Sequence, residues 1–217
     1  TENLLVEVLV SDGDKEVTQS INIQVTGSTE GANNADYSQT NSPVYLVAED
    51  GDTNLTGSQA DDWLVGSDGN NVIYGASGAD TIEGGDGDDI LIGGSLNQGD
   101  VFEDILIGGS GSDIFVIQSH GQEQSDNNSQ YNDMVKDFNS AEDVLDLTDL
   151  LDNLDDKPDS SADSSEIEAF LSEAVKATDE GVEVNGFAAA KFGEGSSFDT
   201  DTVTIIYNEQ EYNINID

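Results

Sequence analysis

The chain has 217 residues, of which 47 are Asp or Glu and five are Lys or Arg, so its formal net charge is −42. So few basic residues exclude nucleic acid as a partner and disfavour an anionic membrane surface, because nothing displaces counterions from phosphate. The absence of Cys excludes disulfides and thiolate metal sites. No run of about 18 apolar residues is present, which argues against membrane insertion. Only 35% of the residues are hydrophobic, and this much negative charge opposes compaction, so the composition predicts that folding needs a cation.

Residues 4–25 predict a β-hairpin, because two alternating apolar runs flank an Asp-Gly turn signal. The pattern resembles the last two strands of the Ig-like or cadherin-like extender domains of large bacterial surface adhesins. Residues 1–27 are therefore expected to be the final hairpin of such a domain, and the chain to be part of a longer one. The small, polar residues 28–47 predict a linker.

From Gly57 to Val116 the sequence repeats every nine residues: GSQADDWLV, GSDGNNVIY, GASGADTIE, GGDGDDILI, an enlarged GGSLNQGDVFEDILI, and GGSGSDIFV. A degenerate unit, AEDGDTNLT, begins at Ala48. Each full unit has a glycine-containing six-residue turn ending in an acid or Asn. A three-residue strand follows, and its middle side chain is expected to point inward. These inward residues are Leu64, Ile73, Ile82, Leu91, Leu106 and Phe115.

The units resemble the RTX repeat, G-G-x-G-x-D-x-U-x, which is a calcium-binding signature. The resemblance implies a mostly β fold: a calcium-bound parallel β-roll over 48–117, with an N-terminal hairpin and a small α+β cap over 118–217. Two units complete one coil of 18 residues, so alternate units stack on the same edge. Stacked carboxylates repel one another, and Ca²⁺, which accepts six to eight oxygen ligands, removes that repulsion.

The resemblance also implies the residues that bind several Ca²⁺ ions. Position six supplies Asp62, Asp80 and Asp104 on one edge, and Asn71, Asp89 and Asp113 on the other. Backbone carbonyls complete four implied sites: Ser58, Ala60, Gly75 and Ser77; Ser67, Gly69, Gly84 and Asp86; Ala76, Gly78, Gly93 and Ser95; Gly85, Gly87, Gly108 and Ser110. Two departures matter: Asn71 replaces the acid and should weaken its site, and the insertion before Asp104 puts Gly93 and Ser95 in doubt.

Downstream, MVKDFNSAEDVLDLTDLLDNL resembles the flank that follows the repeats in type I secreted proteins. Asp137, Asp143 and Asp146 are candidates to cap a last calcium site, or else begin a solvated acidic helix. An amphipathic helix is predicted over 164–177 with Ser164 or Ser165 as N-cap, and strands over 181–192, 202–207 and 211–216.

The C-terminal region therefore resembles an uncleaved secretion signal. The implied partner is the type I secretion ABC transporter machinery, and the implied location is outside a Gram-negative bacterium, secreted or on the cell surface. This fragment is expected to be monomeric.

An enzyme is not expected. His120 is the only histidine, which excludes an H-E-x-x-H zinc site, and no G-x-S-x-G elbow is present. Trp63 and Tyr74 are candidates for a sugar-stacking shelf, but packing on the roll is the simpler interpretation. The alternative to an adhesin is the C-terminal part of a secreted hydrolase or toxin whose catalytic part is absent here.

Outward side chains on one sheet are all apolar: Val72, Tyr74, Ile90, Ile92, Ile114 and Val116. A continuous apolar surface of this size is unusual on a soluble monomer. The pattern predicts that the C-terminal segment packs on this sheet and buries the isoleucines more than Thr81 and Glu83 of the opposite sheet.

Overall fold

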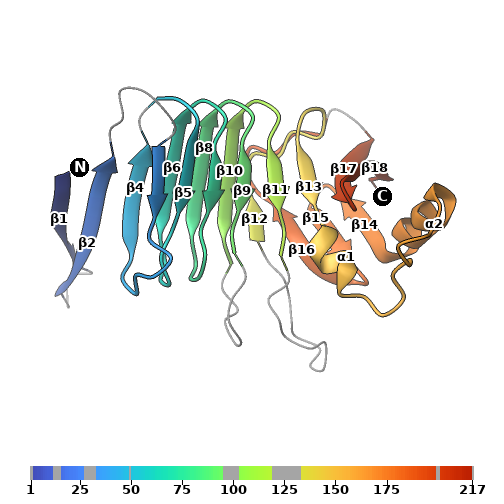
Figure 1. The fold of residues 1–217 in the computed structure, drawn as a ribbon, viewed down its shortest axis with the longest axis horizontal. Coiled ribbons are helices and arrows are strands. Elements are labelled where there is room, and N and C mark those ends of the chain that lie inside the picture. Colours follow the sequence, from blue (N-terminus) through green and yellow to red (C-terminus); the bar gives the residue numbers. More distant parts are fainter. Residues whose placement is uncertain are drawn as a thin grey trace.

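The computed structural model describes residues 2–11, 16–26, 33–48, 50–94, 103–118, 133–198 and 201–216. Two sheets run along the long axis of the molecule, with the strands standing side by side across that axis (Figure 1). The N-terminal strands lie at one end, and the helices lie near the other. The expected mostly β fold with a parallel β-roll is confirmed.

The first sheet has ten strands in this order: β1 (Glu2–Ser11), β2 (Glu16–Thr26), β4 (Val44–Ala48), β6 (Trp63–Asp68), β8 (Thr81–Asp86), β10 (Ile105–Ser110), β12 (Asp133–Val135), β16 (Phe187–Phe192), β15 (Gly181–Val184), β14 (Val175–Thr178). The second has eight: β18 (Gln210–Asn215), β17 (Thr202–Tyr207), β13 (Val144–Asp146), β11 (Ile114–Val116), β9 (Ile90–Ile92), β7 (Val72–Tyr74), β5 (Thr53–Thr56), β3 (Asn33–Asp36). Successive strands of the roll alternate between the two sheets, because each turn carries the chain across.

The parallel register follows the nine-residue repeat. Leu64 pairs with Ile82 in the first sheet, and Ile73 pairs with Leu91 in the second. Ile82 then pairs with Leu106 despite the enlarged unit between them. The insertion therefore leaves the strand register intact, and the expected stacking of alternate units is confirmed.

The core is a file of inward side chains between the sheets. All six predicted inward residues, Leu64 to Phe115, are completely buried. The file continues upstream through Leu46 and Leu55 and downstream through Leu145 and Ile205. Burial of one such side chain contributes about 1.5–3 kcal/mol, so each coil adds a similar increment to the roll.

Upstream of Ala48 the expected boundaries need correction. Strands β3 and β4 pair in parallel with β5 and β6, so the expected linker over 28–47 contains two strands of the roll. Tyr45-Leu46-Val47 repeats the strand pattern of the units without their glycines, and burial of Leu46 explains its inclusion. The predicted hairpin is confirmed as antiparallel β1 and β2, and β2 pairs in parallel with β4. Its assignment to an Ig-like domain stays a prediction.

Downstream, the cap continues both sheets beyond the expected roll boundary at 117. Strand β12 pairs with β10 and β16, and β13 pairs with β11 and β17, all in parallel. Antiparallel hairpins then complete each sheet. The cap therefore lies at the end of the roll, where it supplies hydrogen-bond partners to the exposed edges of the last coil.

The predicted docking of the C-terminal segment on the apolar face is wrong. Ile90, Ile92 and Ile114 are only half-buried, as are Thr81 and Glu83, and Val72 is 38% exposed. Unpaired main-chain groups at the end of the roll require partners more strongly than an apolar surface requires cover, because an unsatisfied buried amide is costly.

Helix α2 (Ser164–Ala174) begins at the predicted residue but ends three residues earlier than predicted, and neither Ser164 nor Ser165 is its N-cap. Its N-cap is Asp163, which accepts hydrogen bonds from the amides of Ser165 and Glu166, while the Glu166 carboxylate accepts one from the Asp163 amide. This reciprocal arrangement is a capping box. The helix ends at Ala174 because Val175 starts β14. The strand expected over 181–192 is the hairpin of β15 and β16.

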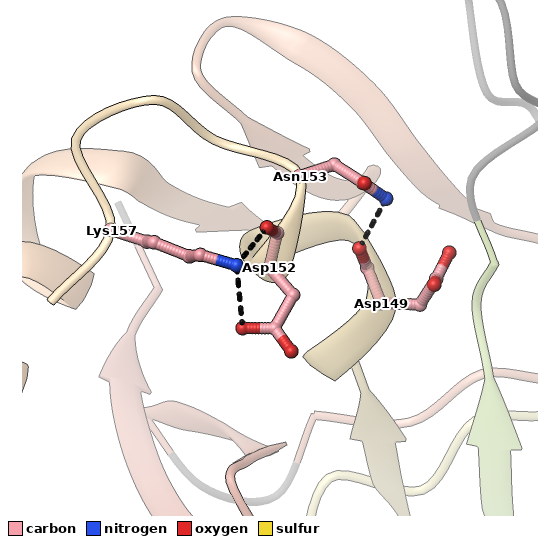
Figure 2. Close-up of polar contacts among 4 residues, drawn as sticks. All are labelled: Asp149, Asp152, Asn153 and Lys157. Atoms are coloured by element: carbon pink, nitrogen blue, oxygen red, sulfur yellow. Dashed lines mark hydrogen bonds and ion pairs between the residues drawn. The ribbon is translucent and has the colours of Figure 1, made fainter. Parts of the chain in front are cut away.

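Helix α1 (Thr148–Asp152) follows β13 and buries two leucines. Figure 2 shows how its C-terminal carbonyls are satisfied: Asn153 Nδ2 donates to the Asp149 carbonyl at 2.7 Å, and Lys157 Nζ donates to the Asp152 carbonyl at 2.5 Å. A lysine suits this position because helix C-termini favour positive charge. Among the described residues, neither helix is long and apolar enough to cross a membrane.

A strained alanine in the turn that begins at Gly75 provides a test of the fold. Ala76 has φ of 85°, whereas the equivalent Gly85, Gly94 and Gly109 take positive φ without a Cβ. We expect Ala76→Gly to stabilise the calcium-loaded protein by about 0.5–1 kcal/mol, because relief of left-handed strain exceeds the entropic cost of glycine. Denaturant unfolding measures this difference. Ala79→Gly, in the same turn without positive φ, should destabilise, and equal effects of the two substitutions would contradict the assignment.

Candidate metal centres

The position-six side chains form one row along each edge of the roll. On the first edge, the amides of Asp62 and Asp80 donate to Oδ1 of Asp80 and Asp104, at 2.7 and 2.8 Å. On the second edge, the Asn71 and Asp89 amides donate to Oδ1 of Asp89 and Asp113, at 2.7 and 2.9 Å. One oxygen of each of these acceptor carboxylates is therefore used to tie successive coils together.

The other carboxylate oxygen faces a carbonyl of the next coil. A Cβ built on Gly75 would collide with both Asp80 Oδ2 and the Gly93 carbonyl oxygen, and one on Gly84 with both Asp89 Oδ2 and the Gly108 carbonyl oxygen. Asp80 Oδ2 and Asp89 Oδ2 are buried and accept no hydrogen bond. Two acceptor oxygens that share a buried space without a donor need a proton or a cation between them.

Backbone carbonyls of the turns also point between coils. On the second edge, the second and fourth residues of a turn contact the carbonyls of the turn stacked before it on the same edge. The pairs are Gly85 with Ser67, Gly87 with Gly69, Gly109 with Gly85, and Gly111 with Gly87. Gly87 has φ of 132°, and a side chain there would collide with the carbonyl oxygen below it. Glycine at these positions therefore leaves room for carbonyl oxygens to approach a common point.

Backbone ligands must dominate any such site. Within the described ranges, no group of three or more carboxylate or imidazole side chains gathers where it could hold a metal ion. Each candidate centre has at most two position-six carboxylates, with Asn71 in place of one between turn 66–71 and turn 84–89, and the rest of its oxygens come from carbonyls. Oxygen-only ligands of this kind suit a hard cation such as Ca²⁺ and exclude metals that prefer nitrogen or sulfur.

Burial makes these carboxylates unusually weak acids when no metal is bound. Desolvation, followed by the negative charge of Asp104, raises the pKa of Asp80 to about 9. Desolvation likewise raises the pKa of Asp104 and of Asp113 to about 7, and those of Asp62 and Asp89 also increase. Protons therefore compete with a cation for these sites.

Several of the other predicted ligand oxygens already accept one hydrogen bond. The Ser58 carbonyl accepts from the Ser77 amide at 3.3 Å, and the Asp86 and Ser110 carbonyls accept from the Gly69 and Gly87 amides, each at 2.7 Å. Each carbonyl keeps a second lone pair. On Asp62, Oδ2 accepts from the Ser58 amide, and Ser58 Oγ donates to the Ala60 carbonyl. Gly93 lies beside Asp104 Oδ2, so the insertion does not displace it. Ser95 lies outside the described residues, as does His120.

Both rows extend into the C-terminal cap. The Asp104 amide donates to Asp133 Oδ1 at 3.3 Å, and the Asp113 amide donates to Asp143 Oδ1 at 3.0 Å. Burial raises the pKa of Asp133 well above its usual range and that of Asp143 to about 6. Sequence reasoning missed Asp133. Its signal was the D-x-U pattern of Asp133-Met134-Val135, which lacks the preceding glycine turn.

The three capping candidates have separate roles. Asp143 joins the second row. Asp137 accepts from the amides of Gly108 and Gly109, both at 2.9 Å, and so covers the last turn. Asp146 accepts from the Thr148 amide at the start of α1. Of the three, only Asp143 occupies the position of a roll ligand.

Asn71 differs from the other position-six residues. Its Nδ2 donates to the carbonyls of Ser67, Gly69 and Gly84, which are three of the expected calcium ligands. The predicted role of Asn71 as a ligand is not supported, because its Oδ1 is used by Thr53, as Oδ1 of the aspartates is used by the coil before, and its other terminal atom is a nitrogen that donates.

Stacked glycine-rich turns with a buried carboxylate row along each edge define a cation-binding β-roll. The chain carries RTX calcium-binding nonapeptide repeats: that family matches residues 47–82, 65–97 and 98–116. A solved structure, the C-terminal domain (RV) of MpAFP, is similar at 35% identity over 75% of this chain and 98% of that chain, with a TM-score of 0.47. No curated protein matches the chain.

The raised pKa values predict how the metal-free roll responds to pH. Unfolded aspartates titrate near 4, so the folded state holds extra protons and is stabilised at low pH. This stability should be lost as the pH rises through about 6, 7 and 9, the pKa values of Asp143, Asp104 and Asp80. Circular dichroism in calcium-free buffer measures the folded fraction. Asp80→Asn removes one of these contributions and should move the midpoint of the loss to higher pH, and a folded fraction that increases with pH would contradict the burial of these groups.

Asp89 and Asn71 should differ in their effect on calcium-induced folding. Asp89 accepts from the Asn71 amide, and its own amide donates to Asp113, so it serves two layers. We expect Asp89→Ala to raise the calcium midpoint by about tenfold or more, because even groups behind metal ligands change affinity by about that factor. Asn71→Ala should raise it less. Calcium titrations followed by circular dichroism that gave equal midpoints would contradict the assigned rows.

Proposed function

We propose that the chain is a calcium-triggered folding module at the C-terminus of a cell-surface RTX adhesin, and that its last hundred residues include the type I secretion signal. The observation that carries the calcium role is the pair of buried, unpartnered oxygens, Asp80 Oδ2 and Asp89 Oδ2, each opposite a carbonyl of the next coil. The RTX repeats over 47–116 support the same role.

The trigger depends on where the ligands meet. Turn carbonyls and carboxylates from residues 18 or more apart converge only when the coils stack, so the binding free energy of calcium contributes directly to folding. Extracellular calcium modules bind at roughly 10⁻⁴–10⁻³ M. In the cytosol, where free calcium is far lower, the chain stays unfolded and can pass through the ABC transporter of a type I system.

The cap links the secretion region to the roll. Asp133 and Asp143, which belong to the cap, accept amides of the last position-six residues, and β12 and β13 pair with the last strands of the repeats. If the C-terminus emerges first, as the RTX resemblance implies, the cap and last coils fold outside and oppose return of the chain.

The alternative is the C-terminal part of a secreted hydrolase or toxin. The N-terminal hairpin, with its resemblance to extender domains, favours the adhesin, and the residues upstream of Thr1 distinguish the two. We assign no catalytic step to these residues in either case. The proposed location is outside a Gram-negative bacterium, with the secretion transporter as the partner.

Folding should require calcium. With 47 acids against five basic residues, charge repulsion should exceed what the narrow core offsets near neutral pH. We expect the strand signal in far-UV circular dichroism to be lost in EGTA and restored by millimolar calcium. Magnesium at equal concentration is the control and should restore less, because it is smaller and demands octahedral geometry. A strand signal unchanged by chelation would rule out the trigger.

A further inference from the structure

The amide nitrogen of Asn71 occupies the place that a carboxylate oxygen takes in the other turns. A Cβ on the first glycine of each of those turns would meet Oδ2 of the position-six Asp: Gly57 and Asp62, Gly75 and Asp80, Gly84 and Asp89, Gly93 and Asp104, Gly108 and Asp113. On Gly66, the Cβ would meet Asn71 Nδ2 at 2.8 Å. The geometry is conserved across the turns, and only the atom differs.

The hydrogen bonds fix which way the Asn71 amide points. Its Oδ1 accepts from the Thr53 amide at 3.0 Å and from Thr53 Oγ1 at 2.6 Å. Its Nδ2 donates to the carbonyls of Gly69, Ser67 and Gly84, at 2.8, 3.2 and 3.5 Å. A flipped amide would place an oxygen against three carbonyl oxygens and a nitrogen against the Thr53 donors. Asn71 is 1% exposed, so water cannot relieve that mismatch.

We propose that the Asn71 amide replaces calcium in the layer between turn 66–71 and turn 84–89, so that this layer binds no calcium and is held together by hydrogen bonds. Ca²⁺ requires oxygens at 2.3–2.6 Å, whereas this space is filled by an N–H₂ group whose hydrogens repel a cation. The inference rests on the proposed function, since it concerns one gap in a calcium-loaded row.

The first two position-six residues of the second edge are therefore both uncharged. Thr53 stands at position six of the turn before Asn71 and donates to it, so neither of the first two coils contributes a carboxylate there. Calcium binding on this edge then starts at Asp89, while on the first edge it starts at Asp62. The upstream part of the second edge folds without the charge neutralisation that the later layers need.

The test is the number of calcium ions bound, counted by native mass spectrometry of the full chain in calcium. Asn71→Asp restores the carboxylate and should bind one more ion than the wild type. The matched control is Asn70→Asp, which adds the same charge one residue earlier on an exposed side chain and keeps the acceptor for the Asp88 amide. It should leave the number unchanged.

Each outcome decides the proposal. An equal count for Asn71→Asp and the wild type overturns it, as does an extra ion in both variants, which would be an effect of charge alone. If Asn71→Asp does not fold, the reciprocal Asp89→Asn decides: loss of one ion with the fold retained supports the proposal, and any other result overturns it. A wild-type chain that binds no calcium contradicts the proposed function itself. This result differs from the outcomes above, in which the wild type binds calcium and only the difference between variants is tested.

Discussion

The structure depends on stacking one buried carboxylate on another. In each row, Oδ1 of a position-six aspartate accepts the amide of the coil before it, which draws successive acids into line along the edge. The same alignment leaves Asp80 Oδ2 and Asp89 Oδ2 buried without a donor. The contacts that align successive coils therefore also create the electrostatic repulsion between their buried oxygens. A hard cation removes this repulsion and leaves the alignment unchanged.

The remaining architecture follows from that arrangement. Glycines at the second and fourth turn positions let carbonyls approach between coils, and single inward residues such as Leu64 and Ile82 fill a core only one side chain wide per strand. Such a narrow core stabilises each coil through its neighbours, as in other repeat proteins. The ends then need closure, which the cap provides through strand pairing and through Asp133 and Asp143.

The Asn71 layer shows two solutions to one geometric problem. Where an aspartate stands, the carbonyls of adjacent turns and the carboxylate are all acceptors, and the space between them must receive positive charge. Where Asn71 stands, two N–H groups enter the same space and satisfy the carbonyls of Ser67, Gly69 and Gly84. This layer therefore gains no stability from calcium binding, and it also does not need calcium in order to form.

The nine-residue period by itself determined the roll, its inward residues and the pairing of alternate units, because turn glycines, acids and strand residues recur in fixed order and each coil contacts mainly its neighbours. Local pattern could not place β3, β4 or Asp133, which lack the glycines of the repeat yet pair with it. It also placed the cap on the wrong surface and left the direction of the Asn71 amide open. Only the tertiary structure decided these points, because hydrogen-bond partners brought together from distant parts of the chain determine where an end is closed and which atom of a side chain faces inward.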